Sequence, residues 1–440
     1  MTTRILAAAI LTASAVVAWL AITFAFVARA LQAAIALSLV YVAYLALRGY
    51  QAMRDARRAT AAVGAPSDGR LWVTVVVAAR NEAPVIGATV AALAGQDYAA
   101  GGEQRFDVVV VDDGSSDDTG DLARAAGAAH ANRVRVIRRE PDDGPRTKGA
   151  VLQFARPHSR GDVIAVVDAD ARIAPDFLVR VMEAWLADPD AAAIQAQRRS
   201  RNLEDGWPAA AQDEELLMDM ASQCGRRAMD GTAELRGNGM FVRREVLDRL
   251  GGWHAAALTE DLELSTRLVA AGERIALAPQ AEVGEEANMT LLGLWRQRLR
   301  WAEGSLRRLM ELGPGLLRQP RVPLGRKLDF LAFTIEFLIP PLFATSIAAG
   351  LLTIPLPRPA DWTVPISLFV GYGLGTFLLA LAGLAASGER GAALLGRATR
   401  GSFFLSHWLL VVPAALLRIA IGRSATTFVQ TPRVGHLPRR

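Results

Sequence analysis

Long apolar runs alternate with mixed polar sequence along this chain and mark its organisation. Apolar residues fill 5–28 and 30–47 near the N-terminus, and further apolar runs occupy 328–355, 364–386 and 402–421. A helix needs about 20 predominantly apolar residues to cross the hydrocarbon core of a bilayer. The pattern therefore predicts two N-terminal transmembrane helices and up to three more membrane helices near the C-terminus.

Between these runs, residues 72–310 alternate strand-like and helix-like segments. The strand-like segments are short, β-branched and without internal polar alternation: 71–79, 106–111, 134–138 and 162–167. Such runs fit strands that are buried on both faces of a parallel sheet. The intervening segments, such as 84–95 and 117–129, are rich in alanine and are predicted to be helices. This order predicts an α/β fold with a doubly wound, mostly parallel sheet.

The two patterns together predict four consecutive parts. Two transmembrane helices in 1–50, joined by a tight turn at Arg29, precede a basic linker in 51–70. A soluble domain is predicted in 71–312. The remainder, 313–440, is predicted to hold two or three transmembrane or interfacial helices and a basic tail.

Arginines flank the apolar runs and orient them. Four follow the second run: Arg48, Arg54, Arg57 and Arg58. By the positive-inside rule they place the soluble domain in the cytoplasm, and the charges in 389–400 predict a cytoplasmic loop. The tail carries Arg423, Arg433, Arg439 and Arg440. Three full C-terminal spans would put this tail outside, against the rule, unless one segment lies in the membrane interface. The sequence leaves both arrangements open.

Composition narrows the classes of function. Of the 440 residues, 52% are hydrophobic, the formal net charge is +5, and the excess charge is almost all arginine. No nucleic-acid recognition motif accompanies the arginines, so nucleic acid is not expected as a partner. The single cysteine, Cys224, excludes an internal disulfide and suits a reducing compartment. The five histidines are scattered, which argues against a histidine-built metal site.

Two apolar strands run directly into acidic residues. Asp112 and Asp113 end the segment FDVVVVDD, and Asp168 and Asp170 end the segment DVIAVVDAD. In open α/β sheets ligands bind beyond the carboxyl ends of the strands. Neighbouring carboxylates there suit a hard divalent cation that is shared with a diphosphate. The alternative is that each aspartate caps the following helix, as expected for Asp117.

Three later segments carry further candidates. The first is a glycine-rich loop with Gly237, Asn238 and Gly239, and the second is a helix start with Thr259, Glu260 and Asp261. Thr259 is a suitable N-cap and the acids suit a helix dipole, which would explain the second segment without catalysis. The third segment concentrates Trp295, Gln297, Arg298, Arg300 and Trp301. An amphipathic helix on the membrane surface would explain the third segment equally well.

In their order and spacing, these motifs resemble the membrane-bound family-2 glycosyltransferases. That group includes cellulose, hyaluronan and poly-N-acetylglucosamine synthases and bacterial glycolipid synthases. The resemblance covers about 72–310 and rests on Asp-Asp-Gly, Asp-x-Asp, Thr-Glu-Asp and Gln-x-x-Arg-Trp. It implies a fold like that of nucleotide-diphospho-sugar transferases, flanked by transmembrane helices.

The resemblance also implies roles on the nucleotide side. Glu82, in the segment ARNE, would open the nucleotide pocket, and Asp113 would contact the base or ribose. Lys148 would lie near the nucleotide. Asp168 and Asp170 would form the Asp-x-Asp pair, with Asp170 ligating Mg²⁺ or Mn²⁺ together with the diphosphate.

On the acceptor side, the resemblance implies a general base and a set of binding residues. Residues 237–239 would line the acceptor end, with Glu260 as a further substrate-binding residue and Asp261 as the base. The Gln-x-x-Arg-Trp motif would hold the diphosphate and the acceptor sugar through Gln297, Arg300 and Trp301. A single base without a carboxylate nucleophile predicts in-line displacement and inversion at the anomeric carbon.

The expected function is metal-dependent transfer of a sugar from a nucleoside-diphosphate sugar to a membrane lipid such as diacylglycerol. UDP is the nucleotide expected from the family, and the sugar is left open. A processive polysaccharide synthase is one alternative, and a non-catalytic nucleotide-sugar-binding membrane protein is another. The expected location is the cytoplasmic (inner) membrane, with a cytosolic catalytic domain.

Overall fold

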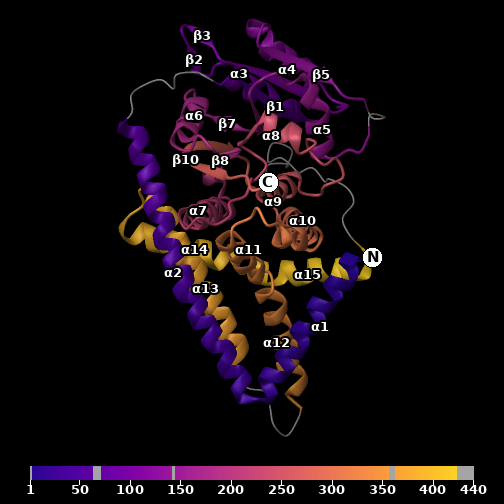
Figure 1. Ribbon diagram of the computed structural model, residues 1–440, viewed down its shortest axis with the longest axis vertical. Helices are drawn as coiled ribbons and strands as arrows, with labels where there is room; N and C mark the ends of the chain where they lie inside the picture. The colour runs from indigo at the N-terminus through magenta and orange to yellow at the C-terminus, as the bar shows by residue number, and fades with distance from the viewer. Residues whose placement is uncertain (1, 63–70, 141–143, 356–361, 424–440) are drawn as a thin grey trace. The chain divides into compact units, whose positions relative to one another are not determined.

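The computed structural model describes residues 2–62, 71–140, 144–355 and 362–423, with side chains described up to residue 59 in the first range (Figure 1). Residues 63–70 of the predicted linker and the tail arginines at 433, 439 and 440 lie outside these residues. The chain divides into two compact units, which we treat separately. The sheet unit comprises 53–216 and 232–289, and the helical unit comprises the described parts of 1–52, 217–231 and 290–426.

The sheet unit is built on eight strands in the order β5-β4-β1-β6-β9-β8-β10-β7. The strands are β1 Val73–Ala79, β4 Phe106–Asp112, β5 Val134–Arg138, β6 Val163–Asp168, β7 Arg172–Ile173, β8 Ala193–Ser200, β9 Met240–Arg243 and β10 Ile275–Glu285. β9 pairs antiparallel with β6 and β8, and β7 pairs antiparallel with β10; the other pairings are parallel. The predicted mostly parallel sheet and its first four strands are confirmed.

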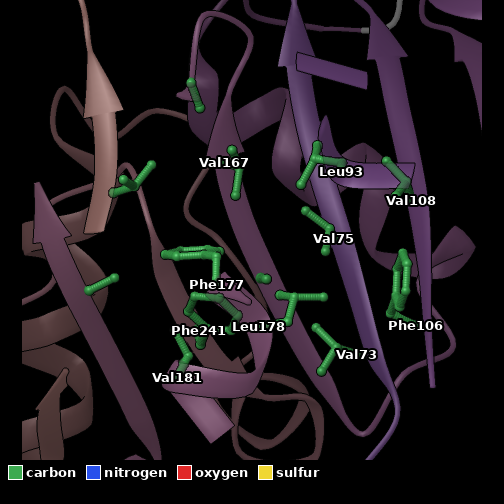
Figure 2. Close-up of a cluster of buried hydrophobic side chains, with 14 of the residues drawn as sticks. Val73, Val75, Leu93, Phe106, Val108, Val167, Phe177, Leu178, Val181 and Phe241 are labelled. Atoms are coloured by element: carbon green, nitrogen blue, oxygen red, sulfur yellow. The ribbon is translucent and has the colours of Figure 1, made fainter. Parts of the chain in front are cut away.

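Alternate residues of the central strands enter two different cores. In β1, Val73, Val75 and Val77 belong to one buried cluster, and Val76 belongs to the other. Successive side chains of a strand point to opposite faces, so a strand covered on both sides is apolar throughout. Figure 2 shows the first core, which contains Val73, Val75, Leu93, Phe106, Val108, Val167, Phe177, Leu178, Val181 and Phe241.

Helices cover both faces of this sheet. α3 (Ala83–Ala94) and α6 (Phe177–Ala187) contribute to the first core. α5 (Lys148–Ala155), α8 (Arg244–Arg249) and α9 (Glu260–Ala270) contribute to the second. The unit also contains α4 (Thr119–Gly127), the short hairpin of β2 (Ala99–Ala100) and β3 (Glu103–Gln104), and the first part of α7 (Trp207–Ala228). This is the doubly wound arrangement that the alternating pattern predicts.

The helical unit contains the apolar helices together with the arginine-rich helix α10. They are α1 Thr2–Thr23, α2 Ala25–Ala62, α10 Leu291–Arg318, α11 Leu324–Glu336, α12 Ile339–Thr353, α13 Thr363–Ala386, α14 Gly391–Leu405 and α15 Trp408–Ile421. By length and composition, five stretches of the described chain could cross a membrane: Thr2–Thr23, Ala25–Ala59, Leu324–Thr353, Thr363–Ala386 and Gly391–Ile421.

Two local expectations in this unit are wrong. The first two helices separate at Phe24, and Arg29 lies inside α2 rather than in a turn. Arginine is a good helix former, whereas the Thr23 hydroxyl bonds back to the Trp19 carbonyl at the end of α1. The predicted loop at 389–400 is largely α14, because alanines and leucines separate its charges and Gly391 (φ +60°) opens the helix.

The last helix runs across the others of its unit. In Figure 1, α15 is drawn across the direction of α1 and α12. It packs against α1, α10 and α12, with Ala7, Leu306 and Val411 in their shared apolar core. A crossing orientation favours an interfacial position for α15, which is one of the two arrangements that the sequence leaves open.

Candidate active site

The first acidic pair lies at the carboxyl end of β4 and is matched by two arginines. Asp112 accepts hydrogen bonds from the Ser115 amide at 2.9 Å and from the Arg138 guanidinium at 2.9 Å. Asp113 forms an ion pair with Arg139, which is 1% exposed. The two arginines follow one another at the end of the neighbouring strand β5, so each aspartate faces its own cation. Such pairing orients the carboxylates as hydrogen-bond acceptors.

The turn after β1 is tied to the start of α4. Asn81 adopts a positive φ of 53°, and the Glu82 amide donates to the Thr119 hydroxyl at 2.8 Å. Asp117 accepts from the Ala83 amide at 3.2 Å and from the Thr119 amide at 3.1 Å. Burial alone would raise the pKa of Asp117, but the hydrogen bond from the Thr119 hydroxyl, together with those from the backbone amides, outweighs burial and lowers the pKa. Asp117 therefore joins the starts of two helices rather than capping one alone.

The second acidic pair, at the end of β6, meets a lysine. The Lys148 ammonium lies 2.5 Å from the Asp168 carboxylate and 3.9 Å from the Glu260 carboxylate. Lys148 is placed at the first turn of α5, where the Thr147 hydroxyl accepts from the Ala150 amide. Burial lowers the pKa of Lys148, but the carboxylates of Asp168, Glu260 and Asp261 raise it above its ordinary value. The ammonium therefore stays charged at neutral pH.

Gly237 lies between the Lys148 ammonium and the start of α9. Its φ is +78°, and a Cβ atom there would lie 3.2 Å from the Asp261 carboxylate and 3.6 Å from the Lys148 ammonium. Asn238 accepts a hydrogen bond from the Asp168 amide at 3.1 Å. The loop thus brings the predicted base, the lysine and the Asp-x-Asp strand together. A side chain at 237 would be strained by its backbone and would crowd the base.

Gly239 packs against strands of the sheet and not against the reacting groups. Its φ is +71°, and a Cβ atom there would lie 2.7 Å from Val283 and 3.2 Å from Ala196. Its amide donates to the Val166 carbonyl at 2.9 Å. The second glycine of the loop is therefore required by close packing between strands.

Capping does not account for the acids of α9. Thr259 occupies the N-cap position, but within the described residues its side chain makes no capping hydrogen bond. Asp261 accepts from the Leu262 amide at 2.8 Å instead. Glu260 is 7% exposed and faces Lys148. Thr259 is therefore at the expected N-cap position without the expected hydrogen bond, and the acids have specific partners in the site.

Asp170 and Asp168 fit a cation that takes its other ligands from substrate. Asp170 is 8% exposed and accepts from the Glu286 amide at 3.4 Å. Among the described residues, no group of three or more histidines, cysteines and acids could hold a metal ion alone. Mg²⁺ and similar ions are often held by one or two carboxylates together with phosphate oxygens and water. The Asp-x-Asp pair therefore suits a metal–diphosphate complex rather than an all-protein metal site.

The Gln-x-x-Arg-Trp motif lies on α10, in the helical unit. Gln297, Arg300 and Trp301 are three and four positions apart, so they share one face of the helix. Between them, Arg298 is 2% exposed, and its guanidinium stacks 4.2 Å from the centre of a Trp301 ring. This contact fixes the tryptophan on the helix.

Two residues that hold the site in place, Arg139 and Ser265, were not predicted from the sequence. Arg139 neutralises Asp113, and the only signal for it is an arginine at the end of an apolar strand. The Ser265 hydroxyl accepts from the Leu235 amide at 2.8 Å and donates to the Asp261 carbonyl at 2.7 Å. It joins the glycine loop to α9 from inside a helix, where sequence offers no signal for such a role.

Known proteins resemble the chain over these same regions. Residues 69–304 match the model of a family described as "Glycosyltransferase like family 2", which is more than half of the chain. A protein of Synechocystis named beta-monoglucosyldiacylglycerol synthase is 32% identical over 82% of this chain and 74% of its own length. The protein of the same name from Trichormus variabilis is 30% identical over 83% and 77%. The chain belongs to glycosyltransferase family 2.

The backbone agrees with this membership. A mannosyltransferase from Pyrobaculum calidifontis, solved in complex with GDP-Man and Mn²⁺, aligns with a TM-score of 0.58 and 23% identity, covering 90% of this chain and all of that one. The likeness shows a shared fold. As a family-2 glycosyltransferase, the chain is an enzyme that transfers a sugar.

Proposed function

We propose that this glycosyltransferase moves one glucosyl group from UDP-glucose to diacylglycerol, with inversion at the anomeric carbon. The observation that carries the proposal is the convergence of Asp261, Lys148 and Asp168 around Gly237. The lipid acceptor and the sugar are supported by the beta-monoglucosyldiacylglycerol synthases, which align with 82–83% of this chain at 30–32% identity. Inversion of an α-linked nucleotide sugar yields a β-glycoside, in agreement with the names of those relatives.

In the proposed reaction, Asp261 acts as the general base. Its carboxylate accepts the proton of the diacylglycerol hydroxyl as that oxygen bonds to the anomeric carbon. The bond from the anomeric carbon to the diphosphate oxygen breaks on the opposite side, and the nucleoside diphosphate leaves with the electron pair. The base must lie about 2.6–3.2 Å from the hydroxyl, and the missing side chain at Gly237 leaves that approach open.

Charged groups would stabilise the departing diphosphate. A divalent cation held by Asp170 supplies charge neutralisation when bound with the diphosphate. Lys148 holds the Asp168 carboxylate in place and keeps its own charge. Asp113, oriented by Arg139, would accept a hydrogen bond from the base or ribose. Fixed groups of this kind need little reorganisation during the reaction.

The proposed location is the cytoplasmic face of the inner membrane. Arg48, Arg54 and Arg57 follow the apolar part of α2, and the positive-inside rule places them in the cytoplasm. With α15 in the interface, the described C-terminal helices no longer require the basic tail to leave the cytoplasm. The acceptor, a membrane lipid, would then be reached from the side where nucleotide sugars are made.

A product assay tests the proposal. Purified protein in vesicles containing diacylglycerol is incubated with radiolabelled UDP-glucose, with Mg²⁺, with Mn²⁺ or with a chelator. Label that moves into a single organic-extractable glycolipid, only when a cation is present, is the expected result. Label in an insoluble polymer would favour the processive synthase. Nucleotide binding without transfer of any sugar from a panel of UDP- and GDP-sugars would favour a non-catalytic role.

A further inference from the structure

One fully buried amide side chain, that of Gln195, contacts the glycine-rich loop from the sheet. Gln195 lies in β8, is 1% exposed, and pairs in register with Met240 of β9. Its neighbours on the strand are apolar alanine and isoleucine side chains. A buried amide is retained only where its hydrogen-bonding groups are satisfied, so its partners indicate its purpose.

The amide binds the loop backbone on both sides of Gly237. Its oxygen accepts from the Arg236 amide at 2.7 Å, and its nitrogen donates to the Asn238 carbonyl at 2.8 Å. The same nitrogen also donates to the Ala196 carbonyl at 2.9 Å. The oxygen therefore binds Arg236 and the nitrogen binds Asn238, which are the two residues that flank Gly237.

Gly237 is the point at which the loop meets the reacting groups. A Cβ atom at 237 would lie 3.2 Å from the Asp261 carboxylate, and Asn238 is bonded to the Asp168 amide. Glycine has more backbone freedom than any other residue, so a glycine in this place needs external constraint to hold one conformation. The two hydrogen bonds of Gln195 supply that constraint from the sheet.

We propose that Gln195 is a positioning residue for sugar transfer. It fixes the 236–238 backbone, and through it the space in which the acceptor hydroxyl meets Asp261. The inference rests on the proposed function, since it takes Asp261 as the base. Gln195 acts through Gly237 and Asn238 and has no contact with nucleotide in this scheme, so its loss should lower kcat while nucleotide affinity is kept.

The chain offers a matched control two residues away. Gln197 is in the same strand and is equally buried, at 1% exposed, but its nitrogen donates to the carbonyls of Arg198 and Leu216. Neither carbonyl belongs to the glycine loop. Gln197→Leu therefore reproduces the loss of a buried amide from β8 without releasing the loop.

The test compares Gln195→Leu with Gln197→Leu in the full-length protein in vesicles, below the unfolding temperature of both. A misplacement of about 1 Å costs about 100-fold in rate, so Gln195→Leu should lower kcat by about 100-fold. The Kd for UDP with Mg²⁺ should stay within about 2-fold of wild type, because ground-state binding is untouched. Equal kcat values in the two variants would overturn the inference.

A second variant separates positioning from general loss of packing. In Gln195→Glu, the carboxylate can still accept from the Arg236 amide, but its other oxygen faces the carbonyls of Asn238 and Ala196. Burial and those carbonyls raise the pKa of such a carboxyl group, and its protonated form restores the missing donor. The ratio of the variant's kcat to that of wild type should rise as the pH falls from about 8 to about 6. A ratio that stays constant would contradict the proposed role.

The wild-type control separates the two hypotheses. If the wild-type protein transfers no sugar, the proposed function fails and this inference fails with it. If wild type is active and Gln195→Leu matches Gln197→Leu, the inference fails alone.

Discussion

The two acidic strand ends look alike in sequence and differ in their surroundings. At the end of β4, Asp112 and Asp113 each meet their own arginine, and Arg139 is almost completely buried against Asp113. At the end of β6, one lysine lies against Asp168 and Glu260, and its pKa is raised also by Asp261. The first pair is held in place as a set of acceptors, whereas at the second strand end one cation is shared among three carboxylates from two elements, β6 and α9.

This difference assigns different chemistry to two similar motifs. A carboxylate that is paired one-to-one with a buried arginine can accept hydrogen bonds but has little charge left to attract a metal ion. At the second strand end, Asp168, Glu260 and Asp261 share one ammonium, so this region beside Asp170 retains negative charge that favours a divalent cation. The first strand end therefore suits recognition of the base or ribose, and the second suits the metal, the diphosphate and the base.

Replacing the base should give the largest effect. Asp261→Asn keeps the shape of the side chain but removes the proton acceptor, so kcat should fall by about 10²- to 10⁴-fold. Nucleotide affinity should remain close to wild type, because the first strand end is unchanged. Transfer assays and UDP binding measure the two quantities.

Glu263→Gln is the matched control for that variant. Glu263 lies in the same first turn of α9, but its carboxylate pairs with Arg267 at 2.8 Å. Its replacement should leave kcat within about 3-fold of wild type, as expected for a largely structural ion pair. Turnover of Asp261→Asn equal to that of Glu263→Gln would remove Asp261 from the mechanism.

Arg138, the last residue of β5, and Arg139, which follows it, test the pairing at the first strand end. Arg139→Leu leaves the buried Asp113 carboxylate without its cation, and loss of one partner of a buried pair costs about 3–5 kcal/mol in the free energy of unfolding. Arg138 is 45% exposed and Asp112 keeps the Ser115 amide as a donor, so Arg138→Leu should cost less than Arg139→Leu, although the Asp112 carboxylate is itself buried. Denaturant unfolding in detergent measures both. Equal losses would mean that burial does not distinguish the two pairs.

The metal assignment is tested by comparing the two strand ends directly. Asp170→Asn should lower kcat/KM by about 100-fold and remove the stimulation of nucleotide binding by Mg²⁺ or Mn²⁺. Asp113→Asn should raise the KM for the nucleotide sugar by about 10-fold, since it weakens one hydrogen bond to the nucleotide, and should keep the cation dependence. Cation titrations of nucleotide binding give the answer. Cation dependence lost in Asp113→Asn and kept in Asp170→Asn would reverse the assignment.

Much of the fold could be predicted because its signals are local. Strand β1 is apolar at every position except Thr74 since both of its faces are buried, and α3 follows it with apolar residues at helical spacing. The antiparallel strand β9 was not predicted, because its four residues lie beside the glycine loop and are too few to show a period. The break at Phe24 was missed because the residues on both sides are equally apolar.

The residues of the candidate site could be predicted from the sequence, but the contacts between them could not. The spacing of Asp168 and Asp170 after a strand is visible in the sequence, whereas the contact of Lys148 with Asp168 depends on how α5 packs on the sheet. Likewise, Gln195 and Gln197 look identical as alternate residues of one strand. Their roles differ because only Gln195 forms hydrogen bonds with the backbone of residues 236–238.

The smallest expected effect concerns Asp117, which joins the turn after β1 to the start of α4. Its pKa is lowered in the folded state, so the folded state favours the ionised form, and the stabilisation is present above the unfolded pKa of about 3.9. It is lost as the pH falls through the lower folded value. Asp117→Asn should therefore reduce stability by about 1 kcal/mol or less at neutral pH, because the group is exposed to solvent. The difference from wild type should shrink as the pH falls below about 4.

Asp118→Asn provides the control for this last prediction, because it changes the net charge equally at the next position. Asp118 occupies the N-cap position of α4, and within the described residues its side chain makes no capping hydrogen bond there. Thermal unfolding between about pH 3 and pH 7 should show a pH-dependent difference for Asp117→Asn and a smaller one for Asp118→Asn. A difference for Asp117→Asn that grows towards low pH would mean that its hydrogen bonds favour the protonated form. The first strand end would then owe its order to the arginines alone.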